Sequence, residues 1–286
     1  MMSSKSSLSL GVYFLSILST INAQYSLAAT YNAANFFSDF TFFTAADPTA
    51  GYVVYEPLAA AEEAGLVSTA NNQVYLGVDH TTLNPSGGRE SVRLTSNQAW
   101  GEADIEHMPG GVCGIWPAFW MFGPNWPNSG EIDIIEGVNL GTTNTITLHT
   151  AAGCTVSNAN SQSGTTTITS NCNQDNAGTG CGVATSNTQN YGTGFNAIGG
   201  GVYAMQWAST GIYVWFWPRG SIPADITAKD IDNIVFDTTF CGTWAGSVWS
   251  SGSCASAAST CQAYVAQNPS AFTNAYWLIN YVQVWQ

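Results

Sequence analysis

Short runs of aromatic and β-branched residues, separated by Gly, Pro, Asn and Asp, recur along most of the chain. Short apolar runs bounded by turn residues predict β-strands, and many of them in succession predict an all-β sandwich or barrel. We expect strands within residues 51–55, 73–78, 90–94, 132–135, 145–149, 201–207, 212–217, 233–236 and 276–284. Only 59–64 and 255–266 have a helix-forming composition, and both segments are short.

The last predicted strand has two chemically different faces. It alternates Trp277, Ile279 and Tyr281 with a second set of side chains that includes an asparagine. A strand this apolar at the end of the sequence needs sheet partners from earlier in the chain. We therefore expect a single domain over residues 24–286.

Residues 1–23 have the pattern of a secretory signal peptide. Lys5 precedes an apolar stretch at 8–21, and small residues lead to Ala23, after which cleavage is expected. The stretch holds about 14 apolar residues, fewer than the roughly 20 needed to cross a bilayer. The sequence predicts a secreted, extracellular protein with no stable membrane association.

The seven cysteines fit an oxidising compartment. Exported chains use cysteines for disulfides, and the odd number leaves one thiol unpaired. A bridge is expected within residues 241–261, where three cysteines share a Gly/Ser-rich loop. Neither a Cys-x-x-Cys pair nor a Cys/His cluster has the spacing of a zinc site, so no metal and no other cofactor is expected.

The charge balance narrows the choice of partner. The 286 residues include 5 basic and 18 acidic ones, for a formal net charge of −13, and aromatic residues (13%) outnumber charged ones (8%). This aromatic content excludes a disordered chain. So few basic residues cannot neutralise phosphates, which excludes nucleic acid and anionic membranes as partners. We expect a monomer.

The segment SGEIDIIEG concentrates three carboxylates, Glu131, Asp133 and Glu136. On a strand the first two share one face, and the isoleucines after each point into the core. Glu136 would fall on the opposite face unless a β-bulge at 134–135 returns it to the carboxylate face. With such a bulge the two Glu carboxyls lie on the order of 5 Å apart, the separation of a retaining glycosidase.

An acidic strand face has two simpler explanations, a solvated surface and a calcium site. The flanking sequence favours chemistry instead, because Trp116, Trp120 and Trp126 lie close before Glu131. Trp rings can stack on the apolar faces of sugars, and Trp126, in a Pro/Asn-rich turn, is best placed to do so. At least one of the three is expected in the core.

The motifs GIWPAFW, GPNWPNSGEIDIIEG, TLHT, GGGVY, WPRGSIP and WLINYV resemble the fungal laminarinase branch of glycoside hydrolase family 16. The resemblance covers nearly the whole chain after residue 23. It implies a β-jelly-roll sandwich of the concanavalin A-like lectin/glucanase type, with two antiparallel sheets and a concave substrate cleft. It also implies an endo-β-glucanase that hydrolyses internal β-1,3 or mixed β-1,3/1,4 glucosidic bonds with retention.

The resemblance implies a role for each carboxylate. Glu131 would be the nucleophile and Glu136 the acid/base, while Asp133 would hydrogen-bond the nucleophile and help to separate their proton affinities. Two other functions stay open on the same residues. A glucan transglycosylase would use the same two Glu, and a lectin-like sandwich would bind β-glucan without cutting it. The intact triplet argues against the lectin.

The resemblance also suggests substrate-binding residues, namely His149, Arg93, Trp116, Trp120 and Trp126. His149 has an equal alternative as a hydrogen-bonded sheet residue, and Arg93 would equally serve to balance local acids.

Trp215 and Trp217 are expected in the core. Two segments, 96–106 and 226–234, are shorter than in the family, and the second gap would account for a missing half-cystine.

Overall fold

The computed structural model describes residues 27–99, 102–156, 165–167, 169–175, 178–208, 211–223 and 233–285. The predicted signal peptide, residues 1–23, lies outside them. Among the described residues, no helix combines the length and the apolar character needed to cross a membrane.

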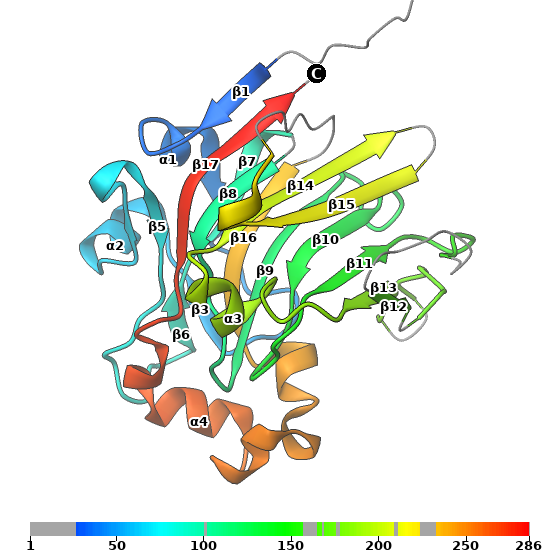
Figure 1. The fold of residues 1–286 in the computed structure, drawn as a ribbon. Helices are drawn as coiled ribbons and strands as arrows, with labels where there is room; N and C mark the ends of the chain where they lie inside the picture. The colour runs from blue at the N-terminus through cyan, green and yellow to red at the C-terminus, as the bar shows by residue number, and fades with distance from the viewer. Residues whose placement is uncertain are drawn as a thin grey trace, which may run out of the picture.

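Two large antiparallel sheets pack against each other as a sandwich (Figure 1). Within the described residues the first sheet has seven strands, in the order β15 (Gly211–Pro218), β14 (Gly201–Ala208), β8 (Glu102–His107), β17 (Trp277–Trp285), β5 (Val74–Leu76) and β4 (Val67–Ser68), with β1 (Leu27–Tyr31) also paired to β17. The second has eight, in the order β12 (Thr165–Thr167), β13 (Cys181–Thr185), β11 (Thr145–His149), β10 (Glu131–Glu136), β9 (Ile115–Phe122), β16 (Asn233–Phe240), β7 (Arg93–Ala99) and β2 (Phe40–Phe42). A short parallel pair joins β3 (Val53–Tyr55) to β6 (Arg89–Ser91).

Each sheet sends alternate side chains into a common core. Ile105 and Ile279 of the first sheet pack in one cluster with Phe119, Ile132 and Ile134 of the second, and all five are buried. The other half of each strand points away from the core. The sandwich therefore has two outer faces on which functional side chains can gather.

The helices are short. They are α1 (Phe36–Asp39), α2 (Leu58–Glu63), α3 (Gly192–Ala197) and α4 (Cys261–Gln267), with 3-10 turns at Ala70–Asn72, Arg219–Ser221, Trp249–Ser251, Ser253–Ser256 and Pro269–Phe272 and a π turn at Gly242–Gly246. The helix expected at 59–64 is α2, whereas the segment 255–266 divides between a 3-10 turn and α4.

Every segment expected to be a strand contains one, so the all-β prediction is confirmed. The pattern missed β9, a central strand, because Pro117 lies in its middle and proline is rare in central strands. It also assigned Tyr281 to the wrong face. The register of β17 shifts between Ile279 and Tyr281, so Trp277 and Ile279 are buried but Val282 takes the next core position.

The prediction that Trp215 lies in the core is wrong. Trp215 is 38% exposed, and Trp217 is half-buried beside it. The reason is alternation, since Ile212, Val214 and Phe216 take the core-facing positions of β15.

Three disulfides brace the sandwich: Cys113–Cys254, Cys172–Cys181 and Cys241–Cys261. The last confirms a bridge within residues 241–261 and joins the end of β16 to α4. Cys154 is the unpaired thiol, and it is exposed.

The short segment 96–106 still supplies parts of β7 and β8, each paired on both sides. Most of the other short segment, up to residue 232, lies outside the described residues.

Candidate active site

A β-bulge in β10 brings the three predicted carboxylates to one face. Ile134 is the extra residue, because Asp133 and Ile135 pair with consecutive residues of β9. The residues opposite Glu131, Asp133 and Glu136 alternate along β9, and they are Phe122, Trp120 and Ala118. The predicted bulge is therefore confirmed, and it places all three carboxyls on the outer face of the eight-stranded sheet, hereafter the carboxylate face.

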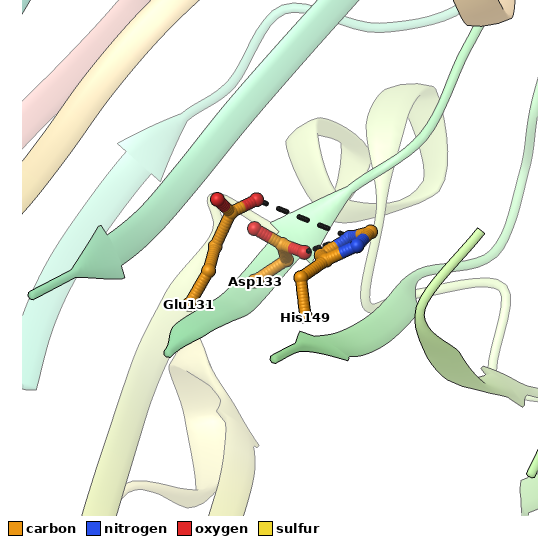
Figure 2. A group of neighbouring side chains, drawn as sticks. All are labelled: Glu131, Asp133 and His149. Atoms are coloured by element: carbon orange, nitrogen blue, oxygen red, sulfur yellow. Dashed lines mark ion pairs between the residues drawn. The ribbon is translucent and has the colours of Figure 1, made fainter. Parts of the chain in front are cut away.

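Glu131, Asp133 and His149 form a compact group on this face (Figure 2). His149 lies directly across from Glu131 on β11, with Nε2 3.2 Å from Asp133 Oδ2 and 3.9 Å from Glu131 Oε1. These are ion-pair contacts rather than aligned hydrogen bonds, since Asp133 Oδ2 has no hydrogen-bond partner. On the other side of the ring, Nδ1 lies 2.5 Å from Gln174 Oε1, which can only accept, so Nδ1 carries a hydrogen.

Glu136 is held by an indole. Trp116 Nε1 donates to Glu136 Oε1 at 2.8 Å, and Glu136 is 9% exposed. Burial, and then the neighbouring charge of Asp133, raises the pKa of Glu136 well above its usual 4.5. Glu136 therefore holds its proton to a higher pH than an ordinary glutamate does. Because Oε1 accepts the indole N–H, that proton belongs on Oε2.

The other two carboxyls also resist ionisation. Burial, reinforced by Asp133, raises the pKa of Glu131 to about 8, while His149 and a hydrogen bond from Trp126 oppose the shift. Burial likewise raises the pKa of Asp133 to about 8. Adjacent buried carboxyls cannot both carry a full charge, so the pair shares a proton at neutral pH. Asp133 is the deeper of the two, with its side chain 3% exposed against 17% for Glu131.

Asn144 clamps the bulge. Its Nδ2 donates to the Ile134 carbonyl at 2.7 Å, and its Oδ1 accepts the Glu136 N–H at 2.9 Å. Asn144 is fully buried, and its own N–H donates to Asn190. One amide side chain thus forms hydrogen bonds with two backbone groups at the bulge, where the register of β10 shifts. These bonds fix the backbone that carries Glu136.

We expect Asn144→Ala to lower kcat by about 100-fold with KM nearly unchanged, because a displacement of about 1 Å at a reacting group costs that much. Asn139→Ala is the matched control. Asn139 is also buried and bridges Gly114 N–H and the Ala245 carbonyl, away from β10. Both variants should lose similar melting temperature, but only Asn144→Ala should lose kcat. Equal kcat values in the two variants would show that Asn144 only supports the fold.

Arg93, Trp120 and Asp237 form a second cluster on the carboxylate face. Arg93 lies opposite Asp237, and its guanidinium stacks between the rings of Phe43 and Trp120, at 4.6 and 4.9 Å. Burial raises the pKa of Asp237 to about 7, Arg93 opposes that shift, and the charge of Glu131 adds to it. Asp237 therefore interacts electrostatically with Glu131, and Arg93 balances part of the negative charge at this face. This agrees with the charge-balancing alternative for Arg93.

The structure brings all five predicted substrate-binding residues to this face. Trp126 is the most exposed of the three indoles, at 44%, and is hydrogen-bonded to Glu131. Trp116 and Trp120 are half-buried. None of the three indoles is a core residue, so the expectation that at least one would be is wrong. The tight alternation of β9 explains this, because Phe119 and Met121 already fill the core positions.

Glu131, Asp133 and His149 each offer a ligand atom, all within 4.8 Å of one another, so they have the chemistry to hold a divalent cation. Here they form a contact chain from Gln174 through His149 to the carboxyls, in which a shared proton balances the charge. That no metal is needed stays a prediction.

Sequence reasoning missed Asp237, Asn144 and Gln174. Asp237 had a signal, as an acid at an alternate position of the apolar strand NIVFDTTF. Gln174 follows its partner His149 in the sequence, and Asn144 follows its partners Ile134 and Glu136, in each case after a turn. The residues that flank them in the sequence give no sign of these contacts.

The fold and the site together define a class of protein, a β-sandwich that carries the paired carboxylates of a glycoside hydrolase on one outer face. Within this class the chain belongs to glycoside hydrolase family 16, because the family model described as an XgeA-like, catalytic GH16 domain matches residues 40–233 and 229–285.

Curated relatives are fungal. A probable endo-1,3(4)-beta-glucanase of Aspergillus niger is 45% identical over 94% of this chain and 41% of its own length. An endo-1,3(4)-beta-glucanase of Arthroderma benhamiae is 40% identical over 96% of this chain and 68% of its own length. The chain spans less than half the length of the Aspergillus niger protein.

Two solved structures are similar across the whole domain. An elongating family 16 β-1,3-glucosyltransferase is 40% identical with a TM-score of 0.82, over 92% of this chain and 100% of that one. Laminarinase 16A from Phanerochaete chrysosporium, with 6-O-glucosyl-laminaritriose in donor and acceptor sites, is 38% identical with a TM-score of 0.83, over 92% and 99%. The jelly-roll prediction is confirmed.

Proposed function

We propose that the chain is a secreted endo-β-glucanase that cleaves internal β-1,3 or mixed β-1,3/1,4 glucosidic bonds with retention. The observation that carries this proposal is the position of Glu131 and Glu136 on one sheet face, with the pKa of Glu136 raised by burial. The names of the fungal relatives and the glucan ligands of the laminarinase support the substrate class. Three disulfides are typical of secreted proteins.

The proposed mechanism is a double displacement. Glu131 attacks the anomeric carbon while Glu136 Oε2 gives its proton to the departing oxygen, which breaks the glycosidic bond and forms a glycosyl ester. Asp133 retains the proton that it shares with Glu131, which leaves the nucleophile negative. Glu136, now ionised, takes a proton from water as the water attacks the ester and releases the sugar.

The exposed ring of Trp126 would stack on a sugar next to the scissile bond. His149 and Trp120, with Arg93 behind Trp120, would lie along the sugar on the same face, and Trp116 would orient the Glu136 carboxyl through its hydrogen bond to Oε1. Each is proposed to bind the substrate or to position a group that does.

The second candidate function is transglycosylation. It is favoured by the similarity to an elongating glucosyltransferase. Such an enzyme would form the same glycosyl ester and pass it to a sugar hydroxyl instead of water.

Product analysis tests both functions. Purified protein is incubated with laminarin, lichenan and chitin, and early products are followed by NMR and chromatography. We expect oligosaccharides from laminarin or lichenan whose first anomer is β. Products longer than the starting oligosaccharide would indicate transfer. An α anomer first would contradict retention, and binding without products would favour the lectin-like alternative.

A further inference from the structure

Three aromatic side chains lie in a row on the outer face of the seven-stranded sheet. Tyr213, Trp215 and Trp217 alternate along β15 with residues that pack on the core, so they point away from it. The catalytic carboxylates point away from the same core on the opposite sheet. The two features therefore occupy opposite outer faces, and the β14–β15 hairpin forms an edge of its sheet (Figure 1).

The aromatic row has an ordered geometry. Tyr213 and Trp215 have ring centroids 5.8 Å apart and planes inclined by 15°, and Trp215 and Trp217 are 6.3 Å apart at 16°. Tyr213 is 42% and Trp215 is 38% exposed. A row of near-parallel, solvent-facing rings is costly to leave in water, which marks an interaction surface.

The neighbouring strands give the row an apolar floor and a polar border. Val202 and Ala204 of β14 lie directly opposite Trp217 and Trp215, and both are buried. On the same face, Asp104 of β8 lies next to Val202. Asp104 binds Arg219, which is 31% exposed, at 2.7 Å. A ligand on the rings would therefore meet the guanidinium of Arg219 at one side, whose charge Asp104 balances from below.

We propose that Tyr213, Trp215 and Trp217 form a second binding site for a neutral β-glucan chain, separate from the catalytic face. This inference rests on the proposed function, since the ligand is the polymer that the catalytic face would cut. The rings suit the apolar faces of sugars, and the row extends over more than one ring, so it suits an oligosaccharide rather than a single sugar.

Charge argues against the other occupants. A net charge of −13 repels an anionic polymer. A second copy of the chain would carry the same net charge of −13. A neutral polyhydroxyl chain meets no such repulsion and can hydrogen-bond to the partly exposed Arg219 guanidinium.

The site would act by holding the enzyme on the polymer. Attachment through one face raises the effective concentration of glucan chains at the other. The effect should therefore be large on insoluble glucan and absent on short soluble oligosaccharides, which fill the catalytic face alone.

The test measures binding to insoluble β-1,3-glucan in a sedimentation assay, in a Glu131→Gln background that leaves the polymer uncut. The double variant Trp215→Ala/Trp217→Ala should lose about 5-fold in affinity, and Trp215→Phe/Trp217→Phe should keep most of it. Leu83→Ala is the control, because Leu83 is apolar and 65% exposed away from the row. With Glu131 restored, hydrolysis of laminarihexaose should be unchanged in all three.

Unchanged affinity in the folded alanine variant would overturn the proposal. So would a wild-type dimer that the alanine variant converts to monomers, because the row would then bind a second copy. If the double variant does not fold, Trp215→Gln decides by the same assay. If the wild-type protein cuts no glucan but the row still carries binding, the proposed function fails and this site stands; cutting without row-dependent binding gives the reverse.

Discussion

Glu131→Gln is expected to abolish hydrolysis of laminarin and lichenan, with kcat lower by at least about 10⁴-fold, as for other covalent nucleophiles. The amide is isosteric with the carboxyl but cannot form the glycosyl ester. Glucan binding should survive, because Trp126 and the rest of the carboxylate face are untouched. Initial rates of reducing-sugar release, with binding measured by calorimetry, check both halves of the expectation.

A matched variant makes the assignment specific. In Glu131→Ala the space of the carboxyl is free. Azide should restore cleavage of an activated β-glucosyl fluoride and give the α-azide, since azide displaces fluoride once, from the side of Glu131. A β-azide product, or reducing-sugar release by Glu131→Gln at the wild-type rate, would mean that the nucleophile lies elsewhere.

Glu136→Gln is expected to cost about 10²- to 10⁴-fold in kcat on glucans, the range for general acid catalysis. The loss in kcat/KM should be much smaller on an aryl glycoside with a good leaving group, because its oxygen departs without a proton and kcat/KM does not include the later hydrolysis of the ester. In the wild-type enzyme the raised pKa of Glu136 keeps the acid protonated to a higher pH than an ordinary glutamate. Activity on glucans should therefore persist above the usual pKa of a glutamate and fall as pH rises through the raised pKa.

The pH profile contains its own control. The alkaline fall on glucans should vanish in Glu136→Gln when an activated aryl glycoside is the substrate, because no titrating acid is then required. Trp116→Phe removes the indole that donates to Glu136 Oε1 and should move the alkaline limb upward, since that hydrogen bond lowers the pKa. An alkaline limb that persists unchanged in Glu136→Gln would assign it to another group.

The sequence predicts the sandwich and the bulge for the same reason, the period of two along a strand. Glu131 and Glu136 are an odd number of residues apart, so a shared face requires one extra residue, and Ile134 is that residue. The same period also leads to one wrong assignment. It misplaces Tyr281 because a register shift in β17 is invisible in the alternation of apolar residues.

Other features depend on contacts between distant segments. Asp237 joins the site only because β16 pairs with β9, and Trp215 is exposed only because its strand is at a sheet edge with its alternate residues in the core. Local sequence specifies neither neighbour. The pairing of Cys113 with Cys254, 141 residues apart, is beyond reach for the same reason.

The hydrogen bonds of Asn144 make its role depend on the extra residue, Ile134, in β10. Without one isoleucine, β10 would pair regularly and still carry its three acids on one face, because the two Glu would then be four residues apart. The side chain of Asn144 would then lose both its acceptor, the carbonyl of residue 134, and its donor, the N–H of residue 136. It would become a buried amide with unmet hydrogen bonds. We therefore expect the extra residue in β10 and an asparagine at position 144 to be gained or lost together in related sequences.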